Sequence, residues 1–230
     1  MRSTSFGLAV LFVGGLAGLS AVAQQAPPAP TAPPPRFVVV LDAAHGGDDT
    51  GGHFANNQVE KAFTLALSVR LRSLLGARGI QVVTTRESDT AIDPNRRAEI
   101  ANHAAAQACL ILHASASGSG VHLFSSSLAQ TQPVRFPAWK TAQAAWVTRS
   151  LALAGSLNST LLQAGMTVTL GRTSLPTLDS MTCPAVAVEI APELGSDKSV
   201  TAALDDPGYQ ARIASTLAAA LVAWRTEARP

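Results

Sequence analysis

Four residues of this chain carry side chains suited to binding a metal ion or moving a proton: His45, Glu60, His113 and Glu189. Two imidazoles and a carboxylate are the usual protein ligands of a hydrolytic zinc site, which keeps a further position for water. Magnesium and calcium prefer more oxygen ligands, so zinc is the better match. The residues are far apart in the sequence, and a zinc site therefore requires a fold that brings separate segments together.

The positions of these residues relative to predicted strands and helices favour such a meeting. His45 lies just after an apolar strand, and His113 and Glu189 each end another. In α/β proteins the reactive groups gather beyond the carboxyl ends of the strands. Glu60 lies on the same helical stripe as Phe63 and Leu67. A carboxylate on a buried stripe is costly unless it has a partner, and a cation would supply one.

Each of these residues also has an ordinary structural interpretation. A His at the end of a strand is commonly a hydrogen-bonded core or surface residue. A Glu in the first turn of a helix interacts favourably with the helix dipole. A Glu after an apolar strand can be a simple edge charge. The positions of the residues alone leave these interpretations open beside the metal site.

The segment that carries these residues alternates between predicted strands and helices, which indicates an α/β sandwich with a largely parallel sheet. Asn56 or Asn57 is available to cap the first helix, and Asp93 and Asp206 precede prolines that begin two later helices. Apolar runs predict strands at 37–42, 79–84, 109–113, 121–125 and 184–189, and apolar stripes predict helices at 58–75, 93–106, 137–163 and 206–224.

The N-terminal part of the chain has the composition of a secretory signal peptide. Arg2 precedes an apolar stretch at 6–22, and a small-residue pattern ends at Ala23. We expect residues 1–23 to be a cleaved signal peptide, with an N-terminal membrane anchor as the alternative. Residues 24–35 are rich in proline, which predicts an extended linker. We then expect the folded domain to cover 36–230 and the mature chain to be exported to a periplasm or a cell wall.

The composition of the chain fits one well-buried domain. Hydrophobic residues make up 47% and charged residues 14%, and the formal net charge of +2 gives no indication of a nucleic-acid partner. We expect no stable membrane span and a monomer. Cys109 and Cys183 would meet an oxidising compartment after export, so a disulfide is one interpretation. Free cysteines in buried strands are the other.

Several motifs in the right order resemble the zinc-dependent N-acetylmuramoyl-L-alanine amidase family of the AmiC and CwlV type. The resemblance runs from about residue 37 to 225 and covers nearly the whole folded domain. It rests on Val-Val-Leu-Asp-Ala-Ala-His-Gly-Gly at 39–47, Glu60-Lys61, Gly-Ile-Gln-Val-Val-Thr-Thr-Arg at 79–86, Arg-Ala-Glu-Ile-Ala-Asn at 97–102, Leu-Ile-Leu-His at 110–113, Gly120-Val121 and Pro-Ala-Val-Ala-Val-Glu at 184–189.

This resemblance implies a function, a fold and a role for each site residue. His45, Glu60 and His113 would hold one Zn²⁺, and Glu189 would be the catalytic carboxylate, favoured by a buried setting. The family's fold is a sandwich around a mixed sheet of about six strands. Its substrate is peptidoglycan, in which it hydrolyses the amide between N-acetylmuramic acid and L-alanine. Some relatives also depend on an activator protein.

The sequence departs from the family pattern at three places near the site. Ala43-Ala44 replaces Pro-Gly, Ala114-Ser115 replaces an Asn after the strand His, and the turn after Glu189 reads Ile-Ala-Pro-Glu-Leu at 190–194. None of these removes a metal ligand or the catalytic carboxylate. Two alternative functions stay open: a catalytically weakened peptidoglycan-binding or regulatory module that keeps the fold, and a zinc peptidase that acts on the stem peptide and shares the metal chemistry.

Other polar residues near the motifs have less specific expectations. Asp42 is a candidate to orient a ligand imidazole. Arg86 and Arg97 are expected to brace loops or form structural ion pairs. His53 is expected in a solvated loop, and His122 has no assigned role.

Overall fold

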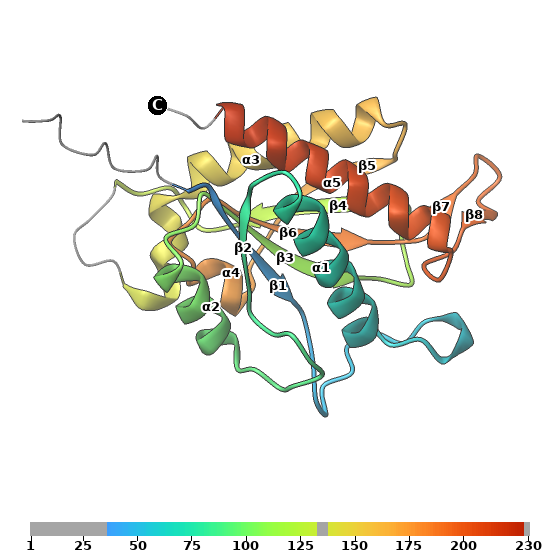
Figure 1. Cartoon of the computed structure of the whole chain (residues 1–230), viewed down its shortest axis with the longest axis horizontal. Coiled ribbons are helices and arrows are strands. Elements are labelled where there is room, and N and C mark those ends of the chain that lie inside the picture. The colour runs from blue at the N-terminus through green and yellow to red at the C-terminus, as the bar shows by residue number, and fades with distance from the viewer. Residues whose placement is uncertain (1–35, 133–137, 228–230) are drawn as a thin grey trace, which may run out of the picture. The chain divides into compact units, whose positions relative to one another are not determined.

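The computed structural model describes residues 36–132 and 138–227, which form an α/β sandwich (Figure 1). The predicted signal peptide (1–23) and proline-rich linker (24–35) lie outside the described residues. The strands are β1 Val38–Ala43, β2 Gln81–Thr84, β3 Ala108–Ala114, β4 Val121–Ser126, β5 Val168–Thr173, β6 Ala185–Ile190, β7 Glu193–Leu194 and β8 Val200–Ala202. The helices are η1 Ala55–Asn57, α1 Glu60–Gly76, α2 Pro94–His103, η2 Trp139–Ala145, α3 Val147–Gln163, α4 Pro176–Asp179 and α5 Pro207–Glu227.

The central sheet has six strands in the order β2-β1-β3-β6-β4-β5. The pairs β1–β2, β1–β3, β3–β6 and β4–β5 are parallel, and β4–β6 is antiparallel. The predicted mixed, largely parallel sheet is therefore confirmed. Because β1, β3 and β6 run in the same direction, their carboxyl ends meet at one edge of the sheet, where His45, His113 and Glu189 lie.

Alternating side chains of the strands build two apolar cores on opposite faces of the sheet. Leu41, Leu110 and Val188 belong to the larger core, which is covered by α1, α3 and α5. Ile111 and Ala187 belong to the smaller core, which α2 and α4 cover. His113 and Glu189 follow Ile111 and Ala187 by two residues, so they lie on the α2 and α4 face of the sheet.

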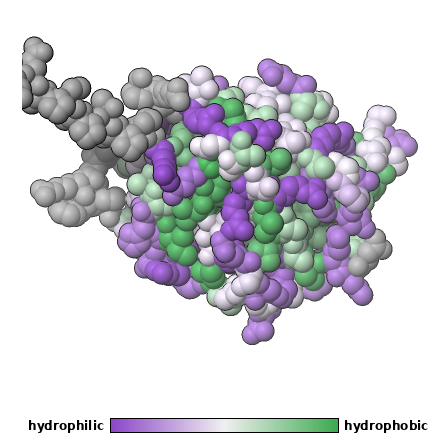
Figure 2. All heavy atoms as spheres, in the orientation of Figure 1, coloured by the Kyte–Doolittle hydropathy of each residue, from purple (hydrophilic) through white to green (hydrophobic). Residues whose placement is uncertain are grey.

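The surface of the molecule mixes apolar and polar residues. Figure 2 shows them interleaved over the face on which α1 lies in Figure 1. None of the helices in the described part of the chain is long and apolar enough to cross a membrane.

Several predicted element boundaries are wrong. The helix predicted at 137–163 begins only at Val147, and η2 before it is kinked at Thr141, whose φ of −132° is not helical. Gln143 is buried in η2 and donates to the carbonyls of Met181 and Cys183. These tertiary contacts, rather than helix propensity, decide the local conformation.

The predicted helix caps are partly confirmed. Asp93 accepts a hydrogen bond from the backbone N–H of Asn95, and Asp206 accepts one from that of Tyr209. The predicted asparagine cap of α1 is wrong, because the N-cap position of that helix is Val59, which makes no side-chain cap bond. Five of the described elements were not predicted: η1, β5, α4, β7 and β8. The strand β5 pairs only with β4 and is partly exposed, so it lacks the continuous apolar run of a central strand.

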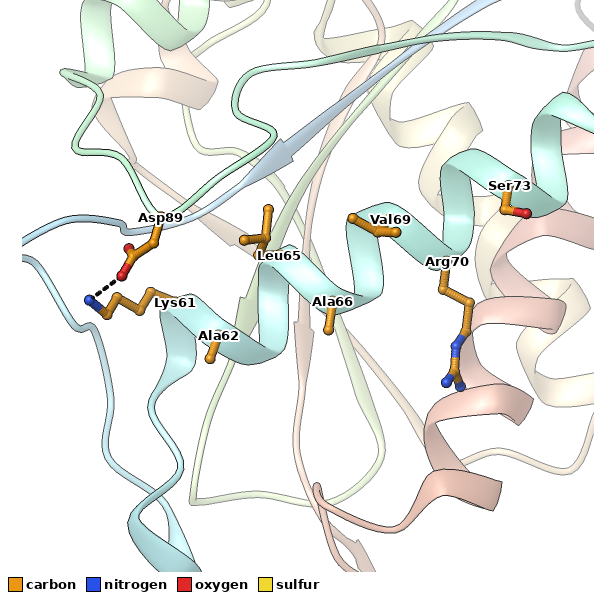
Figure 3. A pocket seen from close by; sticks show the side chains of 8 residues that line it. All are labelled: Lys61, Ala62, Leu65, Ala66, Val69, Arg70, Ser73 and Asp89. Carbon is orange, nitrogen blue, oxygen red and sulfur yellow. Dashed lines mark hydrogen bonds and ion pairs between the residues drawn. The ribbon is translucent and has the colours of Figure 1, made fainter.

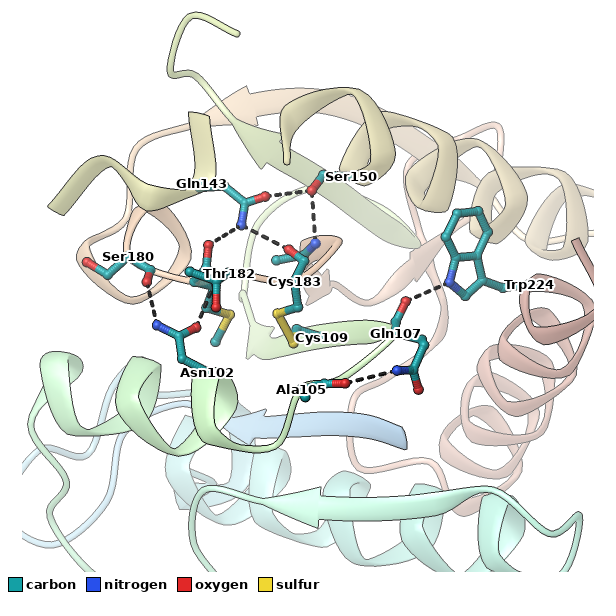
Figure 4. The surroundings of a disulfide bond; sticks show 12 residues. Asn102, Ala105, Gln107, Cys109, Gln143, Ser150, Ser180, Thr182, Cys183 and Trp224 are labelled. Atoms are coloured by element: carbon teal, nitrogen blue, oxygen red, sulfur yellow. Dashed lines mark hydrogen bonds between the residues drawn. A yellow bond between two sulfur atoms is a disulfide. The ribbon is translucent and has the colours of Figure 1, made fainter. Parts of the chain in front are cut away.

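The two cysteines form a disulfide, Cys109–Cys183, at the end of the sheet opposite His113 (Figure 4). It joins the start of β3 to the segment that leads into β6. Hydrogen bonds hold the same segment: Asn102 donates to the carbonyl of Ser180, and Ser150 Oγ accepts from the N–H of Ala185. The disulfide interpretation of the cysteines is therefore the one that the structure contains.

We expect the double substitution Cys109→Ala/Cys183→Ala to lower the free energy of unfolding by about 4 kcal/mol, since the bridge closes a loop between residues 74 apart and restricts the unfolded chain. Guanidinium unfolding with and without a reductant checks this. Reduction should destabilise the wild type and leave the double variant unchanged. Equal stability of the oxidised wild type and the variant would contradict the prediction.

Candidate metal centre

The turn between β1 and α1 places His45 in an unusual backbone conformation. His45 has a backbone φ of 65°, which residues other than glycine rarely adopt. Gly51, with a φ of 64°, lies directly against the site: a Cβ there would be 2.4 Å from His45 Cδ2 and 2.7 Å from Glu60 Oε2. Only glycine permits this approach, so Gly51 allows the turn to pack on the imidazole and the carboxylate.

Glu60 is the first residue of α1 and points to the sheet edge where β1 and β3 end. Its side chain is buried, at 7% exposure, and both carboxylate oxygens have partners. Oε2 accepts the backbone N–H of Gly52 at 2.8 Å, and Oε1 accepts that of Ala114 at 3.1 Å. These bonds hold the start of α1 against the end of β3.

Each of the two predicted ligand imidazoles lies next to a different oxygen of this carboxylate. His45 Nε2 lies 3.1 Å from Oε2 of Glu60, and His113 Nδ1 lies 2.8 Å from Oε1. One potential ligand atom from each of the three residues lies within 4.8 Å of the others. The structure thus brings together three residues that the sequence separates by 15 and 53 positions.

The electrostatic setting keeps Glu60 ionised. Burial by itself raises the pKa of the carboxyl, but the hydrogen bonds from His113, Gly52 and Ala114 outweigh it, so that the pKa lies below its usual value. A buried anionic oxygen pair between two imidazole nitrogens is a suitable donor set for a divalent cation that accepts nitrogen and oxygen ligands.

Two buried arginines hold the turn that carries His45. Arg97 donates to the carbonyls of Ala43 and His45, both at 2.7 Å, and pairs with Asp42 at 2.7 Å. Arg86 donates to the carbonyls of Ala43 and Ala44 at 2.8 and 3.2 Å. The predicted bracing role of both arginines is therefore confirmed.

The predicted role of Asp42 in orienting an imidazole is wrong. Its carboxylate accepts from Arg97 and from the hydroxyl of Thr85 at 2.6 Å, and both pairs are buried. The residue that contacts the imidazole is Asp49, whose Oδ2 lies 2.8 Å from His45 Nδ1. This hydrogen bond lowers the pKa of Asp49, and it leaves Nε2 of His45 directed at Glu60. Asp49 lies in the loop between β1 and α1, and the strand pattern of the sequence does not indicate a role for a loop residue.

Glu189 lies beside this cluster, on the next strand. It is the register partner of His113, and adjacent strands are about 4.8 Å apart. The expected buried setting is only partly found, because its side chain is 32% exposed and its apolar neighbour Val188 points to the opposite face. On its other side Glu189 has His122 as the register partner, with Nδ1 of His122 2.9 Å from Oε1.

His122, like Asp49, contacts a site residue but received no role from the sequence. Its position in an alternating strand was visible, but the antiparallel pairing of β4 with β6 was not. His53 is exposed in the loop before α1, as predicted.

Two hollows lie near the N-terminus of α1. A cleft of about 200 Å³ contains His45 and His113 together with Asp42 and Arg97. A larger, open hollow of about 690 Å³ follows the outer face of α1, where Lys61 pairs with Asp89 (Figure 3). Two of the three candidate metal ligands, His45 and His113, line the smaller cleft, so we take it as part of the candidate site.

The N-acetylmuramoyl-L-alanine amidase family matches residues 39–223, which is most of the chain. The chain therefore belongs to this family. It is 43% identical to N-acetylmuramoyl-L-alanine amidase AmiA of Escherichia coli K12 over an aligned segment of 77 residues. This segment is 34% of this chain and 27% of AmiA. The chain is 32% identical to the germination-specific N-acetylmuramoyl-L-alanine amidase of Bacillus subtilis over an aligned segment of 93 residues. This segment covers 34% of this chain and 39% of that protein. The matches thus span less than half the length of these curated relatives.

Solved structures share the fold over most of the chain. The catalytic domain of CwlV, from Bacillus (Paenibacillus) polymyxa var. colistinus, has a TM-score of 0.64 at 24% identity, over 83% of this chain and 98% of that domain. Ami1 of Mycobacterium abscessus has 0.66 at 20% identity, over 82% and 98%. CwlD of Clostridioides difficile, solved in complex with the GerS lipoprotein, has 0.63 at 19% identity, over 84% and 100%. At these identities the likeness concerns the fold.

We expect Arg97→Lys to weaken the whole turn, because a single ammonium cannot replace the guanidinium that bonds Asp42, Ala43 and His45 together. The free energy of unfolding should fall by about 2–3 kcal/mol, and the affinity of the candidate site for a divalent cation, tested with zinc, by about 10–100-fold. Chemical denaturation and a competitive zinc titration measure the two effects. The matched control is Arg96→Lys on the exposed face of α2, for which both should stay nearly unchanged. Equal effects in the two variants would contradict the prediction.

Proposed function

We propose that this protein is a zinc-dependent amidase that hydrolyses the amide bond between N-acetylmuramic acid and L-alanine in peptidoglycan. The observation that carries the proposal is the convergence of His45, Glu60 and His113 at the sheet edge, with Glu189 on the neighbouring strand. Membership of the family supports the choice of this bond over an amide within the stem peptide.

The three donor residues fit a zinc ion. His45 would offer Nε2, His113 Nδ1 and Glu60 its buried carboxylate, which is the two-His, one-carboxylate set of hydrolytic sites. Bound there, zinc would polarise the scissile carbonyl and lower the pKa of the attacking water. Asp49 would fix the His45 ring through Nδ1, as outer partners of ligand histidines do.

Glu189 is the group we assign to proton transfer. Only Oε1 has a hydrogen-bond partner among the described residues, so Oε2 is free to take the proton of the attacking water. As the water oxygen bonds to the carbonyl carbon and the C–N bond breaks, the carboxyl returns the proton to the leaving amine of L-alanine. The products are a free lactyl carboxylate on the sugar and a stem peptide with a free N-terminus.

The setting of this activity follows from the same proposal. An exported enzyme would meet its substrate in the periplasm or cell wall, and the disulfide supports an oxidising compartment. We further propose that a protein partner regulates the chain, since the related CwlD is found in complex with GerS. We expect the catalytic unit itself to be a monomer.

A digest of purified peptidoglycan by the zinc-loaded domain from Arg36 onward tests the function. Mass spectrometry should show free stem peptides that begin with L-alanine and glycan strands that have lost them, and a chelator should abolish both. Fragments cut within the stem would indicate a peptidase instead. If wall fragments are bound but stay intact, the chain is a binding module.

For Glu189→Gln we expect zinc content to stay at the wild-type level, while kcat falls by about 10²–10⁴-fold because the proton acceptor is lost. Zinc is measured by elemental analysis and kcat by the release of stem peptide. An activity close to wild type would remove Glu189 from the mechanism.

For His113→Ala we expect loss of the bound zinc itself, because one of the three ligand side chains is gone. The control is His103→Ala, at the exposed end of α2, which should bind zinc like the wild type. Elemental analysis after dialysis measures both variants. Stoichiometric zinc in His113→Ala would contradict the ligand assignment.

A further inference from the structure

The hydrogen bond between His122 and Glu189 has no place in the proposed chemistry so far. Nδ1 of His122 lies 2.9 Å from Oε1 of Glu189, and the side chain of His122 is 14% exposed. His122 is not among the three donors that lie within 4.8 Å of one another, so it is not part of the metal set. Its one hydrogen-bond partner in the described part of the chain is Glu189.

The backbone fixes the position of the His122 ring. Gly118 lies directly on it, because a Cβ at Gly118 would be 2.3 Å from Cε1 and 2.8 Å from Nε2 of His122. The φ of +92° at Gly118 is itself one that favours glycine. The edge of the Phe124 ring, 6.3 Å away between centroids, bounds another side. The imidazole is therefore held before any substrate arrives.

The strands that carry His122 and Glu189 are also tied together at this end. The N–H of Ala191 donates to the carbonyl of Gly120 at 2.9 Å, and the N–H of Gly120 donates to that of Pro192 at 3.1 Å. From α5, the hydroxyl of Tyr209 donates to the carbonyl of the same Ala191 at 2.8 Å. The distance between the two side chains is thus set by the main chain on both sides.

A partly exposed carboxylate at a strand end has several accessible rotamers, and catalysis requires one of them. We propose that His122 is a positioning residue: its Nδ1–H holds Oε1 of Glu189 and so fixes the acid–base carboxylate with Oε2 available for proton transfer. This proposal rests on the proposed function of Glu189. The arrangement follows the general pattern in which a third group orients a catalytic base.

The ordinary alternative is a cross-strand pair that contributes a fraction of a kcal/mol to stability and nothing to catalysis. Two substitutions separate the interpretations. His122→Leu removes the donor and keeps an apolar side chain of similar volume. His122→Asn places an amide nitrogen at the δ position, where Nδ1 of the imidazole lies, and so keeps a donor for Oε1.

With zinc-loaded protein, we expect His122→Leu to lower kcat about 10–100-fold at unchanged KM and zinc content, less than the loss from Glu189→Gln. His122→Asn should recover kcat to within about threefold of the wild type. Thermal melting, followed by circular dichroism, controls for folding. If both variants lose kcat equally, or if neither does, the positioning role is overturned.

A second readout does not depend on activity. In ¹⁵N NMR spectra of the zinc-loaded protein at a pH where the imidazole is neutral, His122 should carry its proton on Nδ1, and Glu189→Ala should shift it to Nε2. A proton on Nε2 in the wild type would overturn the proposal. If the wild type releases no stem peptide at all, the amidase function fails, whereas the nitrogen shifts still decide whether His122 holds Glu189.

Discussion

The structure around the site depends on one constraint: the carboxylate of Glu60 is buried and must be satisfied. Its partners come from three different segments, namely the loop at Gly52, the turn at His45 and the end of β3 at His113 and Ala114. Bringing these donors to one point fixes where α1 begins relative to the sheet. The proposed metal ligands, which lie far apart in the sequence, are thereby brought together as a consequence of satisfying one buried charge.

The same constraint explains why Arg86, Arg97 and Asp42 are buried around the turn that carries His45. His45 contacts Glu60 from a left-handed backbone conformation, which is unfavourable for a residue with a Cβ. Arg86 and Arg97 hold the carbonyls of this turn, and Arg97 is itself neutralised by Asp42 on β1. The strain at His45 is therefore offset by ion pairs and hydrogen bonds anchored in the sheet.

Local sequence patterns predicted the central strands of the sheet and the residues at their ends. Continuous apolar runs located β1, β3 and β6, and their ends located His45, His113 and Glu189. Features that depend on pairing over long distances were missed. The edge strand β5 lacks an apolar run, and the partner of Glu189 follows from the antiparallel register of β4 and β6. Asp42 was misassigned because the sequence does not show that a buried arginine lies beside it.

The order of the strands separates the two chemical tasks of the proposed site. Glu189 lies where the sheet changes direction, with His113 beside it on the parallel strand β3 and His122 on the antiparallel strand β4. The parallel side and α1 supply the metal ligands, whereas the antiparallel side holds the proton-transfer group. The unusual turn at 190–194 is bonded to both neighbouring strands: the N–H of Ala191 donates to the carbonyl of Gly120 before β4, and the carbonyl of Ile190 accepts from the N–H of Ser115, two residues after His113. Sequence changes in this turn would therefore act first on the backbone that carries Glu189, and through Ser115 they would also reach the end of β3 beside His113.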